Sequence, residues 1–385
     1  MKYKIPFINP AYRRFYSAHK KEIWVALNSC FERGDLTLRS DVWQLEKNIA
    51  KFVGTKYCAS VNSGTDALFL SLLALGIGKG DSVITVSNTF IATIQAIVHT
   101  GAKPILIDVG YDEQMNVDQI EKAITKRTKA IVPVHYTGMM CGMKQILKIA
   151  RKYNLYVVED FCQALGAKQN GKMAGSFGIL NAVSFNVAKL LGGFCDGGAV
   201  TTNNRGLYEK ICLLRNHWNI HQLSVDRNDY PQPKEMRWAW KSRLSNVNAA
   251  FLNVKFKTIH RIIQRREQIA LRYNAAFREL PPTLEAPIDY HYTQEERIWQ
   301  EYHLKIWNWE REKFAEFLKN KGIETLTRDI IPNHKMKGLG LEHWDLPVTE
   351  QLAAQVIRLP LHEWLKDNEV AYIIKSVKEY FNDKK

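Results

Sequence analysis

The sequence predicts an α/β fold with a mostly parallel sheet between layers of helices, followed by a smaller α+β domain. Short apolar runs alternate with helical stretches through the first half of the chain, which is typical of βαβ units. The runs are apolar on both faces, as expected for strands that helices cover on both sides. The 385 residues, 46% of them hydrophobic, suffice for a large domain at 1–245 and a smaller one at 246–385.

The individual elements follow from local patterns. A helix is expected at 40–53, where apolar residues recur at helical spacing and Ser40 and Asp41 can cap the first turn. Another helix is expected at 13–33. The strands are expected at 82–87, 103–109, 130–134, 156–158, 182–185 and 199–201, and the intervening helices at 91–100, 117–126 and 142–153. The C-terminal domain is expected to contain a long linking helix at 246–277, a strand at 302–307, a helix at 310–321, a turn and strand at 322–325, and helices at 352–359 and 368–381.

Composition excludes several classes of protein. The N-terminal stretch is broken by prolines and lacks the apolar segment of a signal peptide. The most apolar helix candidate, at 67–75, is far too short to span a bilayer, so no membrane span is expected. The six cysteines show no Cys-x-x-Cys pairing. We therefore expect no metal site and a reducing, cytoplasmic location.

The formal net charge of +15 has two interpretations. It favours anionic ligands such as a nucleotide diphosphate, or it reflects a lysine-rich solvated surface. Binding to nucleic acid would need a basic patch on a recognisable module. The lysines are instead spread along the chain, so we expect no nucleic-acid partner.

A carboxylate and a lysine follow two of the predicted strands. Asp160 ends one apolar run, and Lys189 follows the run at 182–185. In a parallel sheet both would lie at the carboxyl edge, where open α/β folds bind ligands. A lysine amine can form a Schiff base with a carbonyl cofactor, and a carboxylate can keep a pyridinium nitrogen protonated. This pair indicates pyridoxal phosphate (PLP) chemistry, whereas His135, at the end of another strand, is not expected to be a catalyst.

A phosphate site is predicted where Ser63, Gly64 and Thr65 lead directly into an apolar helix. Backbone N–H groups at a helix N-terminus bind phosphate, helped by the helix dipole. Alone, this pattern would indicate an ordinary N-cap. Its place ahead of Asp160 and Lys189 favours the site for the PLP phosphate.

The order and spacing of these motifs resemble the DegT/DnrJ/EryC1/StrS family of sugar aminotransferases over residues 5–380. The resemblance is carried by Glu159, Asp160, Gln163, Ser184, Lys189, Gly192, Asp196, Gly197 and Gly198. It implies the type I fold of PLP-dependent aminotransferases. The cofactor would alternate between PLP and pyridoxamine 5'-phosphate during turnover.

The resemblance also implies roles for single residues. Asp160 would pair with the pyridine nitrogen, Gln163 would lie near the phenolic oxygen, and Ser184 would contact the phosphate. Lys189 would form the Schiff base and later shuttle a proton between two carbons. Phe90 would stack on the cofactor ring, the alternative being an ordinary core phenylalanine.

The chain departs from the family pattern at several positions. Val187, Leu190 and Cys195 stand where the family often has proline, asparagine and glycine, which changes shape and polarity beside Lys189. Arg39 replaces a usual glycine. It either touches a substrate phosphate or lies exposed next to a helix.

Residues 217–241 combine proline, asparagine, aspartate and tryptophan, and they predict a long loop. In the family this segment reaches toward the partner subunit's active site. Lys241 replaces the family asparagine that contacts the phosphate there. A lysine can still bind phosphate as a point charge, or it is a solvated surface residue. The resemblance implies a homodimer with shared active sites, to which Lys241 and Arg243 contribute.

The implied activity is transfer of an amino group, from L-glutamate as donor, to a nucleotide-diphosphate keto-deoxysugar. The product would serve surface polysaccharide (O-antigen) or glycoconjugate biosynthesis. One alternative is a PLP-dependent sugar dehydratase of the same family, but those enzymes carry histidine where this chain has Lys189. A second alternative is a non-catalytic regulator. It should have lost Asp160 or Lys189, and both are present.

Overall fold

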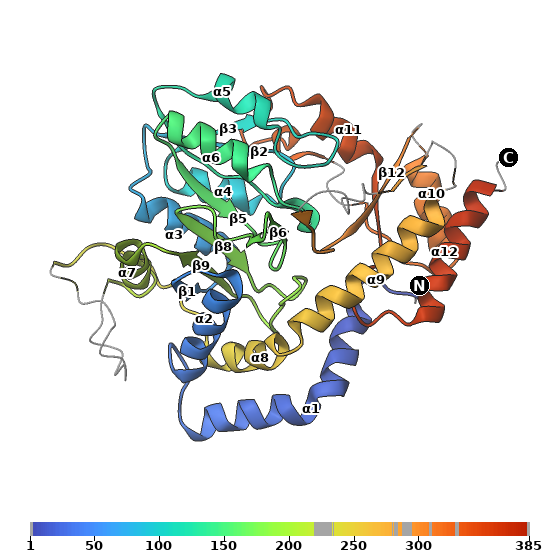
Figure 1. The fold of residues 1–385 in the computed structure, drawn as a ribbon, viewed down its shortest axis with the longest axis horizontal. Coiled ribbons are helices and arrows are strands. Elements are labelled where there is room, and N and C mark those ends of the chain that lie inside the picture. The colour runs from blue at the N-terminus through green and yellow to red at the C-terminus, as the bar shows by residue number, and fades with distance from the viewer. Residues whose placement is uncertain are drawn as a thin grey trace.

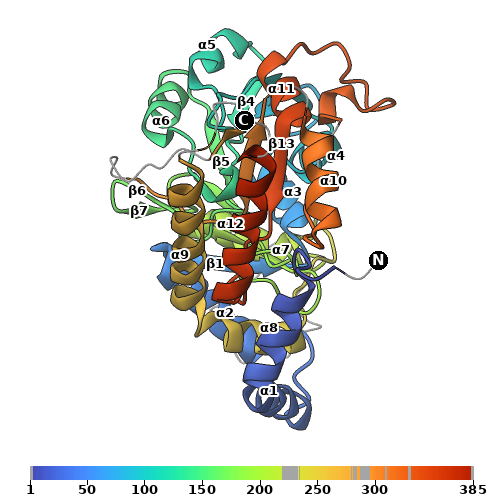
Figure 2. The ribbon, with the colours of Figure 1, turned by 90° about the vertical axis from the view of Figure 1, so that its right-hand side faces the viewer.

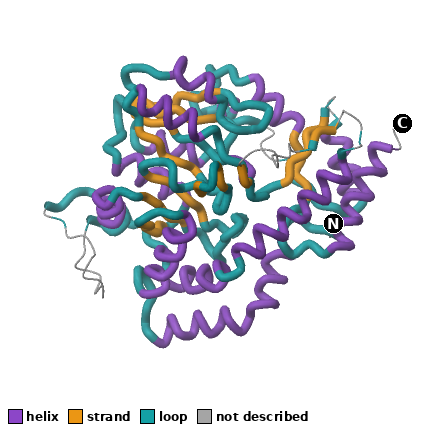
Figure 3. The backbone as a smooth tube through the Cα atoms, in the orientation of Figure 1, coloured by secondary structure: helices purple, strands orange, loops and turns teal. Residues whose placement is uncertain are grey.

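A computed structural model describes residues 3–218, 233, 235–278, 280, 284–286, 295–307, 310–327 and 331–382. Figure 1 shows helix α9 (Ile259–Phe277) running diagonally from the large sheet toward the C-terminal elements. Strands lie inside and helices outside in both parts of the molecule (Figure 3). Among the helices of the described residues, none is long and apolar enough to cross a membrane.

The larger sheet has seven strands in the order β1-β9-β8-β5-β4-β2-β3. They are β1 (Tyr57–Val61), β2 (Ser82–Val86), β3 (Lys103–Ile107), β4 (Thr128–Ile131), β5 (Tyr156–Asp160), β8 (Leu180–Ser184) and β9 (Gly198–Thr202). Only β9 runs antiparallel to its neighbours β1 and β8 in this sheet. The predicted mostly parallel sheet is confirmed.

Helices cover both faces of this sheet, and neighbouring strand residues enter opposite cores. Val157 packs in the core that holds α2 (Ser40–Val53), α5 (Ile120–Ala123) and α6 (Met143–Lys152). The next residue, Val158, packs in the core that holds α3 (Gly64–Ala74), α4 (Ala92–His99) and α7 (Arg205–Leu214). Successive side chains of a strand point to opposite faces, so a strand buried on both faces is mostly apolar.

The smaller sheet is antiparallel, in the order β10-β12-β13. Its strands are β10 (Leu284–Glu285), β12 (Tyr302–Ile306) and β13 (Val356–Leu359). Figure 2 shows α9 beside α12 (Asp367–Asn382), with α10 (Arg311–Asn320) on the other side of α12. Ile5 forms a bridge with Ile323 and is buried in this core, so the start of the chain joins the C-terminal elements. The domain boundary at 245/246 stays a prediction.

The remaining elements are short or lie outside the two sheets. Helix α1 (Asn9–Glu32) packs on α8 (Asn246–Phe256) and bends at His19, where φ and ψ leave the helical range (Figure 1). A small sheet contains β6 (Lys168–Gln169), β7 (Lys172–Met173) and β11 (Glu295–Glu296). Three short 3₁₀ helices occur at Val117–Gln119, Tyr136–Gly138 and Asn333–Lys335 in the described residues.

The prediction of one continuous helix over 246–277 was wrong. The segment forms two helices, α8 and α9, separated at Lys257 and Thr258. The backbone N–H and the hydroxyl of Thr258 both donate to the carbonyl of Lys255, at 2.9 and 2.8 Å. This local hydrogen bonding by threonine competes with the helical pattern and ends α8.

Two further predictions were wrong at element ends. The helix expected at 352–359 ends early: α11 (Pro347–Gln355) is followed by β13, in which Ile357 pairs with Leu304. The β-branched side chains favour the strand. The expected cap of α2 is also absent, since Ser40 donates instead to Asp35 and the N-cap position is Arg39.

Candidate active site

Two adjacent strands of the large sheet bring the predicted catalytic residues to its carboxyl edge. Asp160 is the last residue of β5 and pairs in register with Ala182 of the parallel strand β8. Ser184 ends β8 at the same edge, and Lys189 lies in the loop 185–197 that leads to β9. The structure thus gathers these side chains at one edge, and their chemical roles remain predictions.

Glu159, the neighbour of Asp160, has a structural role. Its carboxylate accepts backbone hydrogen bonds at 2.6 to 2.9 Å from Gly175, Phe177 and Gly178. Nδ1 of His135 accepts the N–H of Cys141 at 3.2 Å, so Nε2 carries the proton and donates to Glu159 at 2.9 Å. Both side chains are fully buried. His135 therefore supports the fold, as expected of a residue that is not a catalyst.

Asp160 has acceptor capacity that the described residues do not use. Its side chain accepts the hydroxyl of Thr93 at 2.8 Å and the backbone N–H of Cys162 at 3.2 Å. A carboxylate has about four lone-pair sites, and no ion pair within the described residues involves Asp160. A buried carboxylate of this kind suits a cationic N–H donor such as a pyridinium nitrogen.

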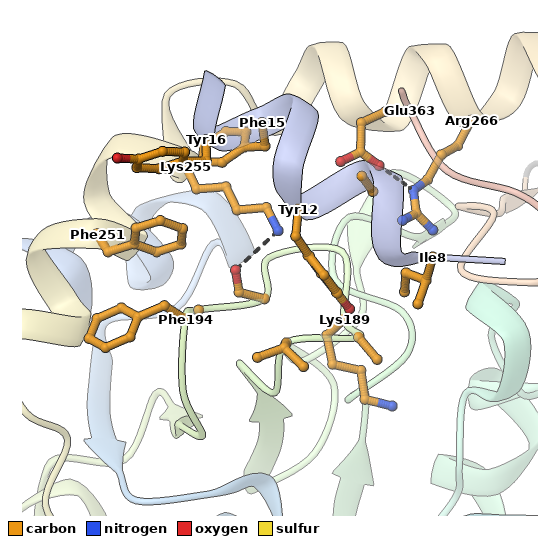
Figure 4. A pocket seen from close by; sticks show the side chains of 15 residues that line it. Ile8, Tyr12, Phe15, Tyr16, Lys189, Phe194, Phe251, Lys255, Arg266 and Glu363 are labelled. Atoms are coloured by element: carbon orange, nitrogen blue, oxygen red, sulfur yellow. Dashed lines mark hydrogen bonds and ion pairs between the residues drawn. The ribbon is translucent and has the colours of Figure 1, made fainter. Parts of the chain in front are cut away.

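The charges of Lys189 and Asp160 both act on the thiol of Cys162. Burial raises the pKa of the Cys162 thiol well above its usual value, Asp160 raises it further, and Lys189 opposes this. Both charged groups are therefore close enough to Cys162 to act on it. Figure 4 shows the half-buried Lys189 with its amine pointing away from the aromatic rings of Phe194 and Phe251.

The first turn of α3 packs against the end of β8. A Cβ atom at Gly64 would lie 2.7 Å from Cβ of Ser184 and 3.1 Å from Sγ of Cys162, so only glycine permits this approach. No described residue accepts a hydrogen bond from the N–H groups of Gly64 or the half-buried Thr65. Ser63 caps the helix by accepting the N–H of Asp66. Free N–H groups beside the Ser184 hydroxyl form a cradle that suits a phosphate.

Phe90 and Gln163 complete the predicted cofactor set. The side chain of Phe90 is 51% exposed just ahead of α4, which excludes the alternative of a core phenylalanine. Gln163 is buried, and its Oε1 accepts the N–H of Thr137 at 3.0 Å. Its amide NH₂ makes no hydrogen bond within the described residues and can donate to a phenolic oxygen.

The positions that depart from the family pattern differ in their surroundings. Leu190 is buried in the large core. Val187 lines a cavity on the other side of the loop, and Cys195 is exposed. Arg39 lies 4.0 Å from Asp35 and is not fully exposed, and a phosphate contact by Arg39 stays a prediction.

Lys241 is exposed and forms a β-bridge with Asn216, whose side chain also accepts a hydrogen bond from Arg243 at 3.3 Å. The bridge holds the end of the predicted loop against the residues that follow α7. The middle of that loop, residues 219–232 and 234, lies outside the described residues.

Sequence reasoning missed a cavity of about 360 Å³ behind the Lys189 loop (Figure 4). Aromatic side chains from α1 and α8 line it, with Lys255 and the ion pair of Arg266 and Glu363 at 3.1 Å. Burial lowers the pKa of Lys255 to about 8, Glu363 opposes this, and Arg266 adds to it. A lysine directly after Val254, on the apolar face of a helix, was a signal that could have identified it.

The family to which this chain is similar uses a cofactor that fits the site described above. The profile of the DegT/DnrJ/EryC1/StrS aminotransferase family matches residues 17–378. This chain belongs to that family. It is a PLP-dependent sugar aminotransferase, and the buried Asp160, the cradle at Gly64 and the exposed Phe90 fit that cofactor.

Three relatives show how far the similarity extends. The dTDP-3-amino-3,6-dideoxy-alpha-D-galactopyranose transaminase of Aneurinibacillus thermoaerophilus is 36% identical over 98% of this chain and 99% of its own. The structure of S. venezuelae DesV in complex with a ketimine intermediate has a TM-score of 0.88 at 30% identity, covering 98% of each chain. NtdA from Bacillus subtilis with bound cofactor PMP has a TM-score of 0.86 at 27% identity, covering 95% of this chain and 82% of NtdA.

Proposed function

We propose that this aminotransferase moves the amino group of L-glutamate to the keto group of a nucleotide-diphosphate deoxysugar. A relative that acts on a dTDP-linked sugar and matches along almost the whole chain supports a nucleotide-sugar substrate. The observation that carries the proposal is the unused acceptor capacity of buried Asp160 at the edge that also holds Lys189. When bound, PLP supplies an electron sink for the carbon that loses a proton.

The residues of the chain have separate tasks in this proposal. The Asp160 carboxylate holds the proton on the ring nitrogen, because a nearby negative charge favours the cationic form. The Gly64 and Thr65 N–H groups bind the phosphate, together with the Ser184 hydroxyl. The Lys189 amine takes a proton from one carbon and returns it to another, which is general acid–base catalysis by a positioned side chain.

The test combines labelling of Lys189 with two half-reactions. The purified protein with PLP is reduced with borohydride, and peptide mapping should place the label on Lys189. In a separate, unreduced sample, glutamate should convert the bound cofactor, and a panel of nucleotide keto-sugars should reverse the change, as ping-pong kinetics requires. A label elsewhere contradicts the role of Lys189. Conversion by glutamate without reversal by any sugar contradicts the substrate class.

We further propose a homodimer in which each subunit supplies Lys241 to the partner's phosphate. Helix α1 exposes an apolar surface that suits burial by a second subunit, with Trp24 47%, Val25 62% and Phe31 55% exposed. Lys189→Ala and Lys241→Ala chains should each be defective, and mixing should restore activity through heterodimers with one complete site. A monomer by light scattering, or unchanged PLP affinity in Lys241→Ala, would count against this arrangement.

The proposed product is an amino sugar for surface polysaccharide, such as O-antigen, or for another glycoconjugate, made in the cytoplasm. All six cysteines are free thiols, which suits a reducing compartment. The dehydratase of the same family remains disfavoured, because Lys189 occupies the position of its histidine.

A further inference from the structure

The side chain of Gln300 contacts the backbone on both sides of Lys189. Its Nε2 donates to the carbonyl of Ala188 at 3.0 Å, and its Oε1 accepts the N–H of Leu190 at 3.1 Å. These two groups belong to the peptide units immediately before and after the Cα of Lys189. One amide therefore restrains both backbone dihedral angles of that residue.

Gln300 is itself held in place by its backbone. Its carbonyl accepts a hydrogen bond from Arg266 of α9 at 3.0 Å, and its N–H donates to the carbonyl of Thr137 at 3.3 Å. Arg266 is fixed in turn by Glu363 at 3.1 Å. The side chain is 6% exposed, so water does not compete strongly for its two hydrogen bonds. Gln300 lies just ahead of β12 and thus connects the smaller sheet with the Lys189 loop.

The Lys189 loop has little regular structure to fix its backbone. Within the loop, the N–H of Lys189 donates to the carbonyl of Asn186 at 2.9 Å. A Cβ at Gly192 would lie 2.3 Å from the carbonyl oxygen of Val187, so the loop closes tightly on itself. From outside, Lys255 donates to the carbonyl of Gly192 at 3.0 Å, on the far side of the loop (Figure 4). The bonds from Gln300 act directly at Lys189.

We infer that Gln300 is a positioning residue that fixes the backbone of Lys189 and so aims its amine at the edge that holds Asp160. This inference builds on the role proposed for Lys189. A lysine side chain is long, and a small change in φ or ψ is amplified at its terminal nitrogen. A displacement of about 1 Å at a reacting atom costs about 10²-fold in rate.

The chain offers a matched control at Gln169. Its Nε2 donates to the carbonyl of Cys141 at 3.3 Å, and its Oε1 accepts the N–H of Met143 at 3.1 Å, on either side of Gly142. Gln169 is also buried, with 4% exposure, and lies on β6. It makes the same pair of contacts with a segment that carries none of the predicted site residues.

The experiment compares Gln300→Met with Gln169→Met. Methionine keeps length and approximate volume but makes neither hydrogen bond. Three quantities are measured: the thermal midpoint, the reactivity of Lys189 toward acetic anhydride in the cofactor-free protein, and the rate at which borohydride traps PLP on Lys189. Gln300→Met should slow the trapping of PLP on Lys189 about 10- to 100-fold. It should also change the acetylation rate of Lys189 by more than twofold. Gln169→Met should leave both within about twofold, whatever its effect on the thermal midpoint.

Gln300→Glu provides a second variant if Gln300→Met is unstable. Glutamate keeps an acceptor for Leu190 but places an oxygen against the carbonyl of Ala188, so a defect at Lys189 is still expected. Equal effects of the Gln300 and Gln169 variants on the Lys189 quantities would overturn the inference, as would wild-type values in both Gln300 variants. Failure of the proposed function is seen separately, as absence of the PLP label from Lys189 in the wild type. The acetylation measurement then still decides the role of Gln300.

Discussion

The loop 185–197 lies between two regions that differ in how far their polar groups are already hydrogen-bonded within the protein. On one side, Asp160 and the N–H groups of Gly64 and Thr65 have hydrogen-bonding capacity that the described residues do not use. On the other side lies an aromatic cavity, which Lys189 also lines and whose other charged side chains have partners. Lys255 donates to the loop, and Arg266 pairs with Glu363.

This difference distinguishes groups that are available to bind a ligand from groups that hold the Lys189 loop in position. Buried polar groups are normally satisfied, so unused capacity that gathers at one edge of a sheet is a sign of a ligand site. Satisfied groups next to the same loop hold it in position. The two lysines illustrate this: the Lys189 amine points away from the rings of Phe194 and Phe251, whereas Lys255 uses its amine to hold the backbone of Gly192.

The largest expected effect is at Lys189. Lys189→Ala removes the group that moves the proton, and the glutamate half-reaction should slow by about 10²- to 10⁴-fold. Rapid-mixing absorbance of the PLP-loaded protein measures this rate. Lys144→Ala, at an exposed position on α6, serves as the control and should match the wild type. A half-reaction in Lys189→Ala within tenfold of the wild type would contradict the assignment.

The neighbours Asp160 and Glu159 test the distinction between unused and satisfied groups. Asp160→Asn should still bind PLP but lose most of the transfer rate, because an amide lacks the charge that favours a protonated ring nitrogen. Glu159→Gln turns an NH₂ group toward backbone donors and should cost about 1–3 kcal/mol of unfolding free energy. Half-reaction rates and denaturant unfolding measure the two effects. A stability loss confined to Asp160→Asn would reverse the interpretation.

Lys255, in the aromatic cavity, should make the free energy of unfolding depend on pH. The pKa of Lys255 is lowered by burial from 10.5 to about 8. Between these values only the unfolded chain binds the proton, so this group makes the folded protein more stable as pH rises. Relative to Lys255→Met, the wild type should gain about 3 kcal/mol from pH 8 to 10.5, since one pKa unit equals about 1.4 kcal/mol. Urea unfolding of both proteins measures the difference, and a constant difference would refute it.

The smallest expected effect is at the phosphate cradle. In Gly64→Ala the new Cβ meets Ser184 at 2.7 Å, and relieving such a contact costs about 1–3 kcal/mol. PLP affinity should weaken by about 5- to 150-fold if the strain moves the cradle. Gly206→Ala, where the new Cβ meets its nearest atom at 3.6 Å, is the control and should leave PLP affinity unchanged. Equal affinities in both variants would place the phosphate elsewhere.

The sequence by itself determined the layered α/β core and the order of residues at its carboxyl edge. Apolar runs such as 82–86 form strands that are buried on both faces, and this pattern is local. Asp160 and Ser184 reach one edge because adjacent parallel strands end together. Where a local pattern was ambiguous the prediction failed, as at Thr258, which ends α8, and at Val356, which begins β13.

Only the tertiary structure decided how the site is supported. Thr93 contacts Asp160 across 67 positions of the sequence, Lys255 contacts Gly192 across 63, and Gln300 contacts Leu190 across 110. No periodicity or motif spacing encodes such contacts, because each is one side chain meeting one backbone group after the whole chain has packed. A hydrogen bond needs its two atoms within about 3 Å and in line, and only the completed fold sets that geometry.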